Sequence, residues 1–531
     1  MAGWERSRKM EVLKKNIHMY RQAKRAVSQI TLEEDFNVPD IKPDVEQIIQ
    51  SKAKTVIGNT RSEAGRFLLK GHVQVSVLYM DDTEGRQIHR LDTQLPFDEY
   101  MNMEGLEPGE TVSLKCEIED LNVVMINSRK LSMRGLLTFT AVTDEIYDMS
   151  AAVEARSDIQ LCQKKKKLEF MQLEVQKKDI IRLKNEILLP SNKPDIQEIL
   201  WENVQLRSCE IHVREGKLAV EGELFVFVLY NGQDENGTKQ WLEHTLPLQG
   251  EVEVSGCRDT LVPDVAVNLS QIELQVNQDM DGEERLIRLE GTLELDMKLY
   301  ALGELDILDD IFSPERELEV FSREEVYENM VMRNQSRVRA AGRIHVEETK
   351  PRILQICNSQ GTVKIDEVQV TETGIQIDGA VLVEILYVSA DDTMPFAVME
   401  GSIPFSHSAD IPGLDDTCRY TLNAGLEQLS TTMADSEEIE VRASVAMNLF
   451  VVRPDRQMCI ADITEKELDL EKLTKLPGIV GYIVQDGDCL WDIARTYYTT
   501  PKRIMELNHL EKQELKKGDH LIIMKELGGI S

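Results

Sequence analysis

The chain has 531 residues, with 94 acidic and 61 basic side chains and a net charge of −33. Such a charge repels phosphate groups, which excludes general binding to nucleic acid and to anionic membranes. The apolar fraction of 42% is typical of a globular protein, and the length predicts about three to four domains.

The first 30 residues are basic, with eight Lys or Arg and only two Glu. Charges interrupt this segment before an apolar run long enough for a secretory signal can form, so we expect no export by that route. No stretch is apolar enough for a membrane-spanning helix, so we also expect no transmembrane segment. We interpret the basic segment as a solvated helix, and the alternative is contact with an anionic membrane.

An internal threefold repeat follows. The sequence KPDVEQII at 42–49 returns as KPDIQEIL at 193–200 and, more weakly, as KPRILQIC at 350–357. Each proline is followed 28 residues later by a glycine, the glycine is followed eight residues later by a tyrosine, and a second proline lies 25 residues after the glycine. The residues are Pro43, Pro194 and Pro351; Gly71, Gly222 and Gly379; Tyr79, Tyr230 and Tyr387; and Pro96, Pro247 and Pro404. A constant spacing of this kind defines a repeat architecture.

The Lys-Pro-Asp segment predicts a short helix in each copy. Proline fits the first helical turn, Val45, Ile48 and Ile49 fall at i, i+3 and i+4, and Asp44 lies near the positive helix end. The third copy has Arg352 at the aspartate position, so we expect a different cap there. The alternative interpretation is that Lys-Pro-Asp marks a binding site.

Each repeat glycine lies within a run of alternating apolar residues, for example from Phe67 to Tyr79, which predicts a long strand with one buried face. The glycine indicates a bulge or bend that lets another backbone approach. We interpret the tyrosines as packing residues, and the alternative is that they line a ligand groove. The middle copy has about five extra residues, which we place in 277–285.

Further alternating runs, such as 286–299, make each copy mainly antiparallel β. The predicted fold class is α+β, with three mainly antiparallel-β repeats and a small C-terminal domain. Each repeat would be sandwich-like or open-barrel-like with a short helix, over residues 10–150, 168–305 and 320–455. We interpret Lys164 to Lys167 as a solvated linker between the first two copies, and the alternative is a site for an acidic partner.

Eight cysteines lie far apart without a CxxC pair, which disfavours zinc sites and a disulfide framework. We interpret them as small buried residues in a reducing cytosol. No GxxxxGKS, GxSxG or HExxH motif is present and the nine histidines are scattered. We therefore expect no catalytic activity, no cofactor and no metal.

A charged linker, 461–475, is predicted to precede a separate domain at 479–526. Residues 482–484 predict a strand, 486–488 a turn with a capping aspartate, and Leu490, Ile493 and Ala494 a helical face. Pro501 opens a second helix and 521–523 form a returning strand, so the order is βααβ. From Ile479 to Ser531 the net charge is only −1, so the negative charge belongs to the repeats.

This segment resembles a LysM domain, with YIVQDGDCLWDIA at its start, IMELN in its second helix and LKKGDHLII at its end. The resemblance implies a groove for glycans that contain N-acetylglucosamine, such as peptidoglycan. That groove would comprise Asp486, Gly487, Asp488, Cys489, Leu490, Asn508, His509 and Leu510. Cys489 replaces the usual threonine, which removes a hydroxyl that could cap the helix or bind sugar, so a protein partner is the alternative. We interpret Tyr482 and Trp491 as core residues.

Three such repeats followed by a LysM-like segment resemble the SPOCS-domain proteins of endospore-forming bacteria. The resemblance implies a sporulation protein in the mother-cell cytoplasm, at the outer forespore surface or in the spore coat. It also implies that the protein is a non-enzymatic adaptor that binds other coat proteins, especially a basal coat ATPase. The alternative is a cell-wall protein that binds peptidoglycan through the LysM groove.

Overall fold

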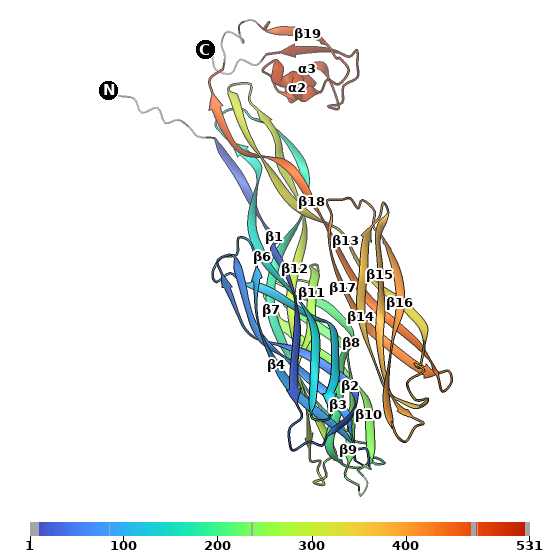
Figure 1. Cartoon of the computed structure of the whole chain (residues 1–531). Coiled ribbons are helices and arrows are strands. Elements are labelled where there is room, and N and C mark those ends of the chain that lie inside the picture. The colour runs from blue at the N-terminus through green and yellow to red at the C-terminus, as the bar shows by residue number, and fades with distance from the viewer. Residues whose placement is uncertain (1–9, 84, 235–236, 469–473, 475, 526–531) are drawn as a thin grey trace.

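The computed structural model describes residues 10–83, 85–234, 237–468, 474 and 476–525. It is an elongated molecule in which three β-rich bodies lie at one end of a narrower stalk and a small domain lies at the other end (Figure 1). Among the described residues, no helix has the length and apolar character needed to cross a bilayer.

Each repeat is built from six antiparallel strands. The first repeat contains β1 (Glu11–Asn37), β2 (Val45–Glu63), β3 (Arg66–Asp81), β4 (Ile88–Asn102), β5 (Val112–Asn127) and β6 (Lys130–Arg156). The second contains β7 (Cys162–Leu188), β8 (Ile196–Arg214), β9 (Lys217–Gly232), β10 (Lys239–Glu253), β11 (Val262–Asn277) and β12 (Leu286–Phe312). The third contains β13 (Glu317–His345), β14 (Ile353–Val370), β15 (Gly374–Ser389), β16 (Phe396–Asp410), β17 (Arg419–Met433) and β18 (Glu438–Lys466).

The six strands of a repeat form two three-stranded sheets. In the first repeat the orders are β1-β6-β5 and β2-β3-β4, and the other repeats copy this topology. Alternate residues of the two central strands, such as Val75 in β3 and Phe139 in β6, are fully buried in one shared apolar cluster. The predicted alternation is therefore confirmed, because one face of each sheet contributes to a common core.

The repeat glycines allow close backbone approach, as predicted. A Cβ atom on Gly71 would lie 2.3 Å from the carbonyl oxygen of Val56, and one on Gly379 would lie 2.4 Å from that of Lys364. The bulge lies on the neighbouring strand, where the pairing register shifts between Ile57 and Asn59 opposite Gly71. Glycine is needed here because the bulged strand presses against its partner.

The tyrosines are packing residues. Tyr79, Tyr230 and Tyr387 have no exposed surface. Their hydroxyl groups donate hydrogen bonds to the carbonyl oxygens of Pro43, Pro194 and Pro351, at 3.2, 3.2 and 2.9 Å. Burial raises the pKa of each phenol to about 12. Two markers of the sequence repeat, 36 residues apart, are thus joined by one buried hydrogen bond.

The predicted helix after each Lys-Pro-Asp is wrong, because these residues begin strands β2, β8 and β14. Two bulges occur in quick succession, with register shifts between Val45 and Gln47 and between Ile48 and Gln50. Each bulge breaks the alternation of side chains, so that a strand acquires a spacing that imitates a helical period. Ile48 consequently packs on the core of its own repeat, whereas Ile49 packs on a cluster between repeats.

That second cluster holds the three bodies together. It contains the equivalent residues Leu78, Leu229 and Leu386, with the fully buried Trp201 and Phe227 from the second repeat. Charged groups border it: the Lys52 ammonium lies 4.5 Å from the Trp201 ring centroid and 3.0 Å from a Glu202 carboxylate oxygen. The repeats are therefore packed against one another through an apolar contact with a polar border.

An ion pair with accompanying hydrogen bonds joins the Lys-Pro-Asp segment to the turn before the last strand of the repeat. In the second repeat Arg285 pairs with Asp195 at 2.7 Å and donates to the carbonyl oxygens of Lys193 and Pro190. Arg129 makes the same contacts with Asp44 and two carbonyl oxygens in the first repeat. In the third repeat the charges are exchanged, and Arg352 pairs with Glu437 at 2.8 Å. The sequence difference at Arg352 is thus compensated by its partner.

The stalk consists of the distal halves of the three longest strand pairs, β1–β6, β7–β12 and β13–β18. All three ribbons contribute to one apolar cluster, through Ile17, Met149, Phe170, Ile307 and Tyr327 among others. About 13 residues per strand extend beyond the first body, which corresponds to about 40 Å. The stalk, with its packed apolar core, thus holds the bodies and the small domain apart.

Two interpretations of basic segments are wrong. From Glu11 onward the N-terminal segment is strand β1 rather than a solvated helix, and Arg21 pairs with Glu145 at 2.7 Å; residues 1–9 lie outside the described residues. Lys164 to Lys167 lie in β7 rather than in a linker, and Lys166 pairs with Asp309 of β12 at 3.3 Å. Antiparallel pairing with an acidic strand accounts for both basic runs.

The chain is mostly antiparallel β, and among the described residues its α-helices α2 (Leu490–Thr496) and α3 (Pro501–Asn508) belong to the C-terminal domain. The α+β assignment therefore fails for the repeats, which lack the predicted short helix. The predicted linker 461–475 is also partly wrong because β18 continues to Lys466, and residues 469–473 and 475 lie outside the described part. The extra residues of the middle copy lie where predicted, in the turn between β11 and β12.

Candidate functional site

The small domain at the tip of the stalk has the predicted βααβ order. Strands β19 (Ile479–Ile483) and β20 (His520–Met524) pair antiparallel, and α2 and α3 connect them. Its core is made by Val484, Leu490, Ile493, Ile504 and Leu521, all nearly inaccessible to solvent. The apolar faces of the two helices therefore form, with the strands, the core of a domain of about 45 residues.

Asp488 closes the loop between β19 and α2. Its Oδ2 accepts hydrogen bonds from the Gln485 backbone N–H and from the Tyr482 hydroxyl, both at 2.7 Å. These bonds lower the pKa of the Asp488 carboxyl, the backbone N–H having the larger effect. Asp488 thus stabilises the loop that presents Asp486 and Gly487 to solvent. Gly487 has a φ of 89°, which a side chain would oppose.

The residue that caps α2 is Cys489 rather than an aspartate, so that prediction is wrong. The Cys489 Sγ atom accepts from the Asp492 backbone N–H at 3.4 Å and donates to the Asp492 carboxylate at 2.9 Å. A thiol therefore occupies the position that usually holds a hydroxyl or carboxylate. Leu490, the next residue, is buried in the domain core.

The second segment of the predicted groove follows α3. Both amide atoms of Asn508 are engaged, since Nδ2 donates to the carbonyl oxygens of Ile504 and Ile522 and Oδ1 accepts from the Ile522 N–H at 2.7 Å. Asn508 thus covers the free edge of β20. His509 is exposed in the left-handed conformation that ends α3, and Leu510 packs on the same core as Leu490. Asp486, Gly487 and His509 are the most exposed of the eight predicted groove residues.

The domain is docked on the end of β12 through contacts that the sequence did not predict. The Trp491 Nε1–H donates to Asp310 at 2.7 Å, and the Arg495 guanidinium also binds Asp310. The Trp491 ring meets Phe312 edge to face, with 4.8 Å between centroids. Trp491 therefore packs on the domain core, as predicted, and on the stalk as well. Tyr482 also packs on this core and lies edge to face with Tyr497.

Other candidate chemistry is limited in the described part of the chain. No group of three or more His, Cys, Asp or Glu side chains there is arranged to hold a metal ion. Cys257, Cys357 and Cys459 are buried as predicted, whereas the other five cysteines are partly accessible. Burial raises the pKa of the Cys357 thiol to about 12, which leaves it unreactive at neutral pH.

Comparison with protein families identifies the parts of the chain. The three bodies and the small domain describe a class of protein built from repeated β modules and one terminal binding module. The SipL, SPOCS domain family matches residues 44–126, 195–277 and 352–434, and the LysM domain family matches residues 482–523. The chain therefore contains three SPOCS-domain repeats followed by a C-terminal LysM domain. No curated protein and no solved structure matches it.

The matched segments correspond to particular elements. Each SPOCS match spans the sheet of three shorter strands and the strand that follows it, β2 to β5 in the first repeat. The long strands that build the stalk lie largely outside these matches. Both families are non-catalytic, and their combination fits a protein of the sporulation coat with a domain of a glycan-binding type.

Proposed function

We propose that this protein is a non-enzymatic adaptor in spore coat assembly. It would lie in the mother-cell cytoplasm at the outer forespore surface and attach the coat by binding a basal coat ATPase through its LysM domain. The observation that carries the proposal is the separation of two kinds of module, with three SPOCS bodies and one LysM domain at opposite ends of the stalk (Figure 1). An adaptor needs two binding ends that can be occupied together.

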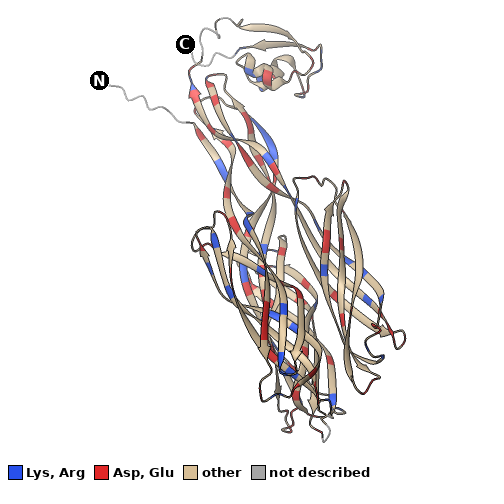
Figure 2. Cartoon of the chain, in the orientation of Figure 1, with Lys and Arg blue, Asp and Glu red and all other residues tan. Residues whose placement is uncertain are grey.

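The charge distribution supports protein partners for the bodies. Acidic and basic residues are interspersed along the strands of the bodies and the stalk (Figure 2). A surface of mixed sign with a net charge of −33 disfavours polyanionic partners and favours specific contacts with proteins.

Point variants in the LysM loops test the proposal. Asp486→Lys combined with His509→Asp changes two exposed groups in the predicted groove and leaves the hydrogen bonds of Asp488 with Gln485 and Tyr482 intact. We expect this variant to fold and to lose capture of the coat ATPase in pull-down experiments from sporulating cells. Lys502→Asp, at an exposed position of α3 outside the groove, is the matched control. Undiminished capture by the double variant would contradict a role for the groove.

A second candidate function is peptidoglycan binding through the same groove. It is favoured by the LysM match and by the exposure of Asp486, Gly487 and His509. The full chain should then cosediment with purified peptidoglycan, and removal of residues from Gly478 onward should abolish the effect. Absence of cosedimentation at high protein concentration would eliminate this candidate.

A further inference from the structure

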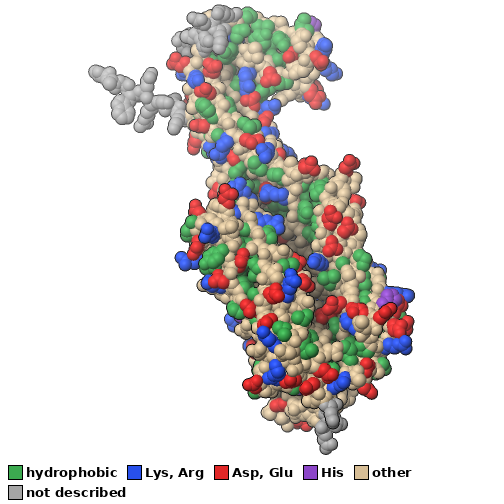
Figure 3. Space-filling view, viewed as in Figure 1, with side chains coloured by type: hydrophobic (Ala, Val, Ile, Leu, Met, Phe, Trp, Pro, Cys, Tyr) green, Lys and Arg blue, Asp and Glu red, His purple; other side chains and the backbone are tan. Residues whose placement is uncertain are grey.

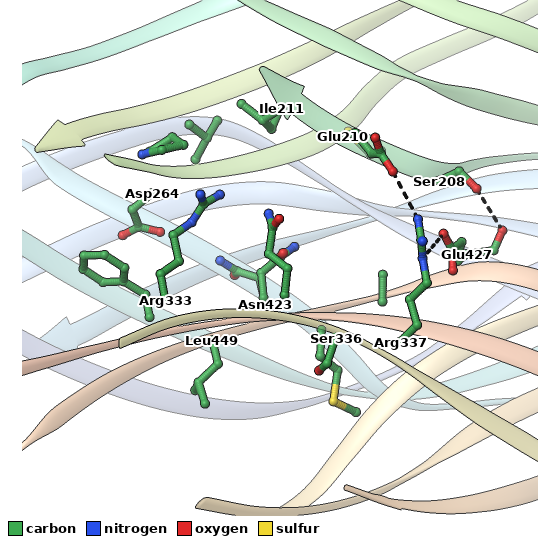
Figure 4. A pocket seen from close by; sticks show the side chains of 18 of the residues that line it. Ser208, Glu210, Ile211, Asp264, Arg333, Ser336, Arg337, Asn423, Glu427 and Leu449 are labelled. Atoms are coloured by element: carbon green, nitrogen blue, oxygen red, sulfur yellow. Dashed lines mark hydrogen bonds and ion pairs between the residues drawn. The ribbon is translucent and has the colours of Figure 1, made fainter. Parts of the chain in front are cut away.

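A cleft lies between the second and third repeats. Its volume is about 530 Å³, within the range of small-molecule sites. The floor is the outer face of the sheet β13-β18-β17, and β8 and β11 of the second repeat form the wall (Figure 4). In the space-filling view the molecule is hollowed between the third body and the other two (Figure 3).

Three side-chain amides form a row across the floor. The strand register places Gln335 opposite Asn448 and Asn448 opposite Asn423, and all three side chains are exposed. Neighbouring strands are about 4.8 Å apart, so the row is about 10 Å wide. Each amide offers both a donor and an acceptor, which allows it to bind a hydroxyl or an acetamido group in either sense.

The next row of the sheet leaves space for a ligand. Arg337 pairs with Ala446, and Ala446 with Gly425. A Cβ atom on Gly425 would meet nothing within 4 Å, so there is open space at this position, between the lining residues Asn423 and Glu427. A glycine in a strand forgoes side-chain packing, and here it keeps a shallow platform free beside the amides.

The cleft contains charges of both signs. Arg337 is neutralised by Glu210 at 3.1 Å and Glu427 at 2.7 Å. At the other end lie Arg333 and Asp264, which have opposite charges, and burial raises the pKa of the Asp264 carboxyl. Asn423 lies between the two arginines (Figure 4). Two arginines against three carboxyl groups leave no excess of positive charge, so this amide-rich surface suits a neutral polar ligand better than a polyanion.

The wall carries a locally strained backbone. Ser208 has a φ of 49° within the bulge of β8 opposite Gly222, and its hydroxyl reaches the Glu427 carbonyl oxygen across the cleft at 3.5 Å. Bulges and positive φ values occur preferentially next to binding sites. The second repeat therefore contributes a shaped wall to the floor that the third repeat provides.

We propose that this cleft binds a neutral, polyhydroxylated ligand, specifically a short oligosaccharide. The site lies in the SPOCS repeats and goes beyond the function assigned to the LysM domain. An extended peptide is recognised mainly by main-chain groups, whereas the floor of this cleft presents a row of side-chain amides. The amides would bind the ligand hydroxyls and the Gly425 platform would admit the sugar rings.

Isothermal titration calorimetry of the full chain with chitotetraose, cellotetraose and maltotetraose tests this proposal. We expect at least one tetrasaccharide to bind, and Gly425→Trp to weaken it at least tenfold by filling the platform. Gln335→Ala and Asn448→Ala should each weaken it roughly fivefold through the loss of a hydrogen bond. Thr432→Trp, an exposed position on the same strand outside the cleft, should bind like the unchanged chain.

The outcomes are decisive because every variant retains the LysM domain. Binding that survives Gly425→Trp and Asn448→Ala would belong elsewhere and would overturn the proposal, as would the absence of binding by all three sugars. Should Gly425→Trp fail to fold, Asn448→Ala decides alone, since its side chain is exposed. If chitotetraose is the sugar bound, sedimentation with insoluble chitin shows whether the cleft also binds this sugar as part of a polymer or only as a free oligosaccharide.

Discussion

The second and third repeats have the same topology, but different ion pairs hold the start of their sheets of shorter strands, at β8 and β14. In the second repeat, Arg285 is 12% exposed and is held by Asp195 and two backbone carbonyl groups. In the third repeat, Arg352 and Glu437 form the corresponding pair with exchanged charges, and both side chains are more than half exposed. The comparison shows that the fold requires a link at this position and accepts either direction of charge.

The same pair of repeats differs at the central glycine. A Cβ atom would lie 2.4 Å from a carbonyl oxygen at Gly379 but 3.1 Å from the nearest one at Gly222. The second repeat has a wider bulge, from Arg207 to Glu210, which moves the neighbouring backbone away. The repeat glycine is therefore required more strictly by its surroundings in the third repeat than in the second.

The largest expected effect comes from adding a methyl group at the glycine. Gly379→Ala should lower the free energy of unfolding of its repeat by about 3 kcal/mol, because the backbone must move to relieve the contact. Gly222→Ala should cost about 1 kcal/mol. Native-state hydrogen exchange of β15 and β9 measures the two effects separately. Equal costs would contradict the steric explanation.

Removal of the buried arginine should have the next largest effect. Arg285→Ala removes the donor to the Asp195 carboxylate and to the Lys193 carbonyl group, and it should destabilise the second repeat by about 2 to 3 kcal/mol. Arg352→Ala removes an exposed ion pair and should cost less than about 1 kcal/mol. Hydrogen exchange at Ile196 and Ile353, whose amides lie beside these links, reports each change.

Loss of the tyrosine hydroxyl should cost less and should be similar in all repeats. Tyr230→Phe and Tyr387→Phe each leave one proline carbonyl group unpaired, at a cost of about 1 kcal/mol. Thermal unfolding followed by circular dichroism of the backbone in the far ultraviolet measures this change. A much larger effect in one repeat would indicate that its Pro–Tyr link has an additional role.

A pH effect should distinguish the repeats at the contact between bodies. Glu384 of the third repeat is half-buried there and accepts a hydrogen bond from the Gln50 side chain at 2.5 Å, whereas Phe227 is the corresponding residue of the second repeat. Burial raises the pKa of Glu384 above its ordinary value of 4.5. Its contribution to stability is fully present below pH 4.5 and is lost as the pH rises through the higher folded-state pKa.

Glu384→Gln should therefore flatten the pH dependence of the opening free energy of β15 relative to β9. Hydrogen exchange between pH 4.5 and pH 7 measures this difference. An unchanged slope would show that other carboxyl groups account for the titration.

The sequence predicted the elements whose signals are local. The alternating residues around Gly71 predicted a strand, and the apolar spacing from Leu490 to Ile504 predicted the helices of the LysM domain. The predicted helix at Val45 was wrong because two closely spaced bulges produce the same spacing within a strand.

Features that depend on distant residues could not be predicted from the sequence. Asp310 and Trp491 are 181 residues apart, and no local pattern connects them. The row of Gln335, Asn448 and Asn423 arises only when three strands pair in register. The stalk was also missed, because each ribbon buries its apolar face only when the other two ribbons are present.

The position of a fluorescent fusion in sporulating cells tests the central claim most directly. The adaptor proposal predicts a ring around the forespore that disappears when residues from Gly478 onward are removed. An intact ring after this truncation would contradict recruitment through the LysM domain. An even signal along the wall of vegetative cells would contradict the adaptor proposal itself and favour peptidoglycan binding.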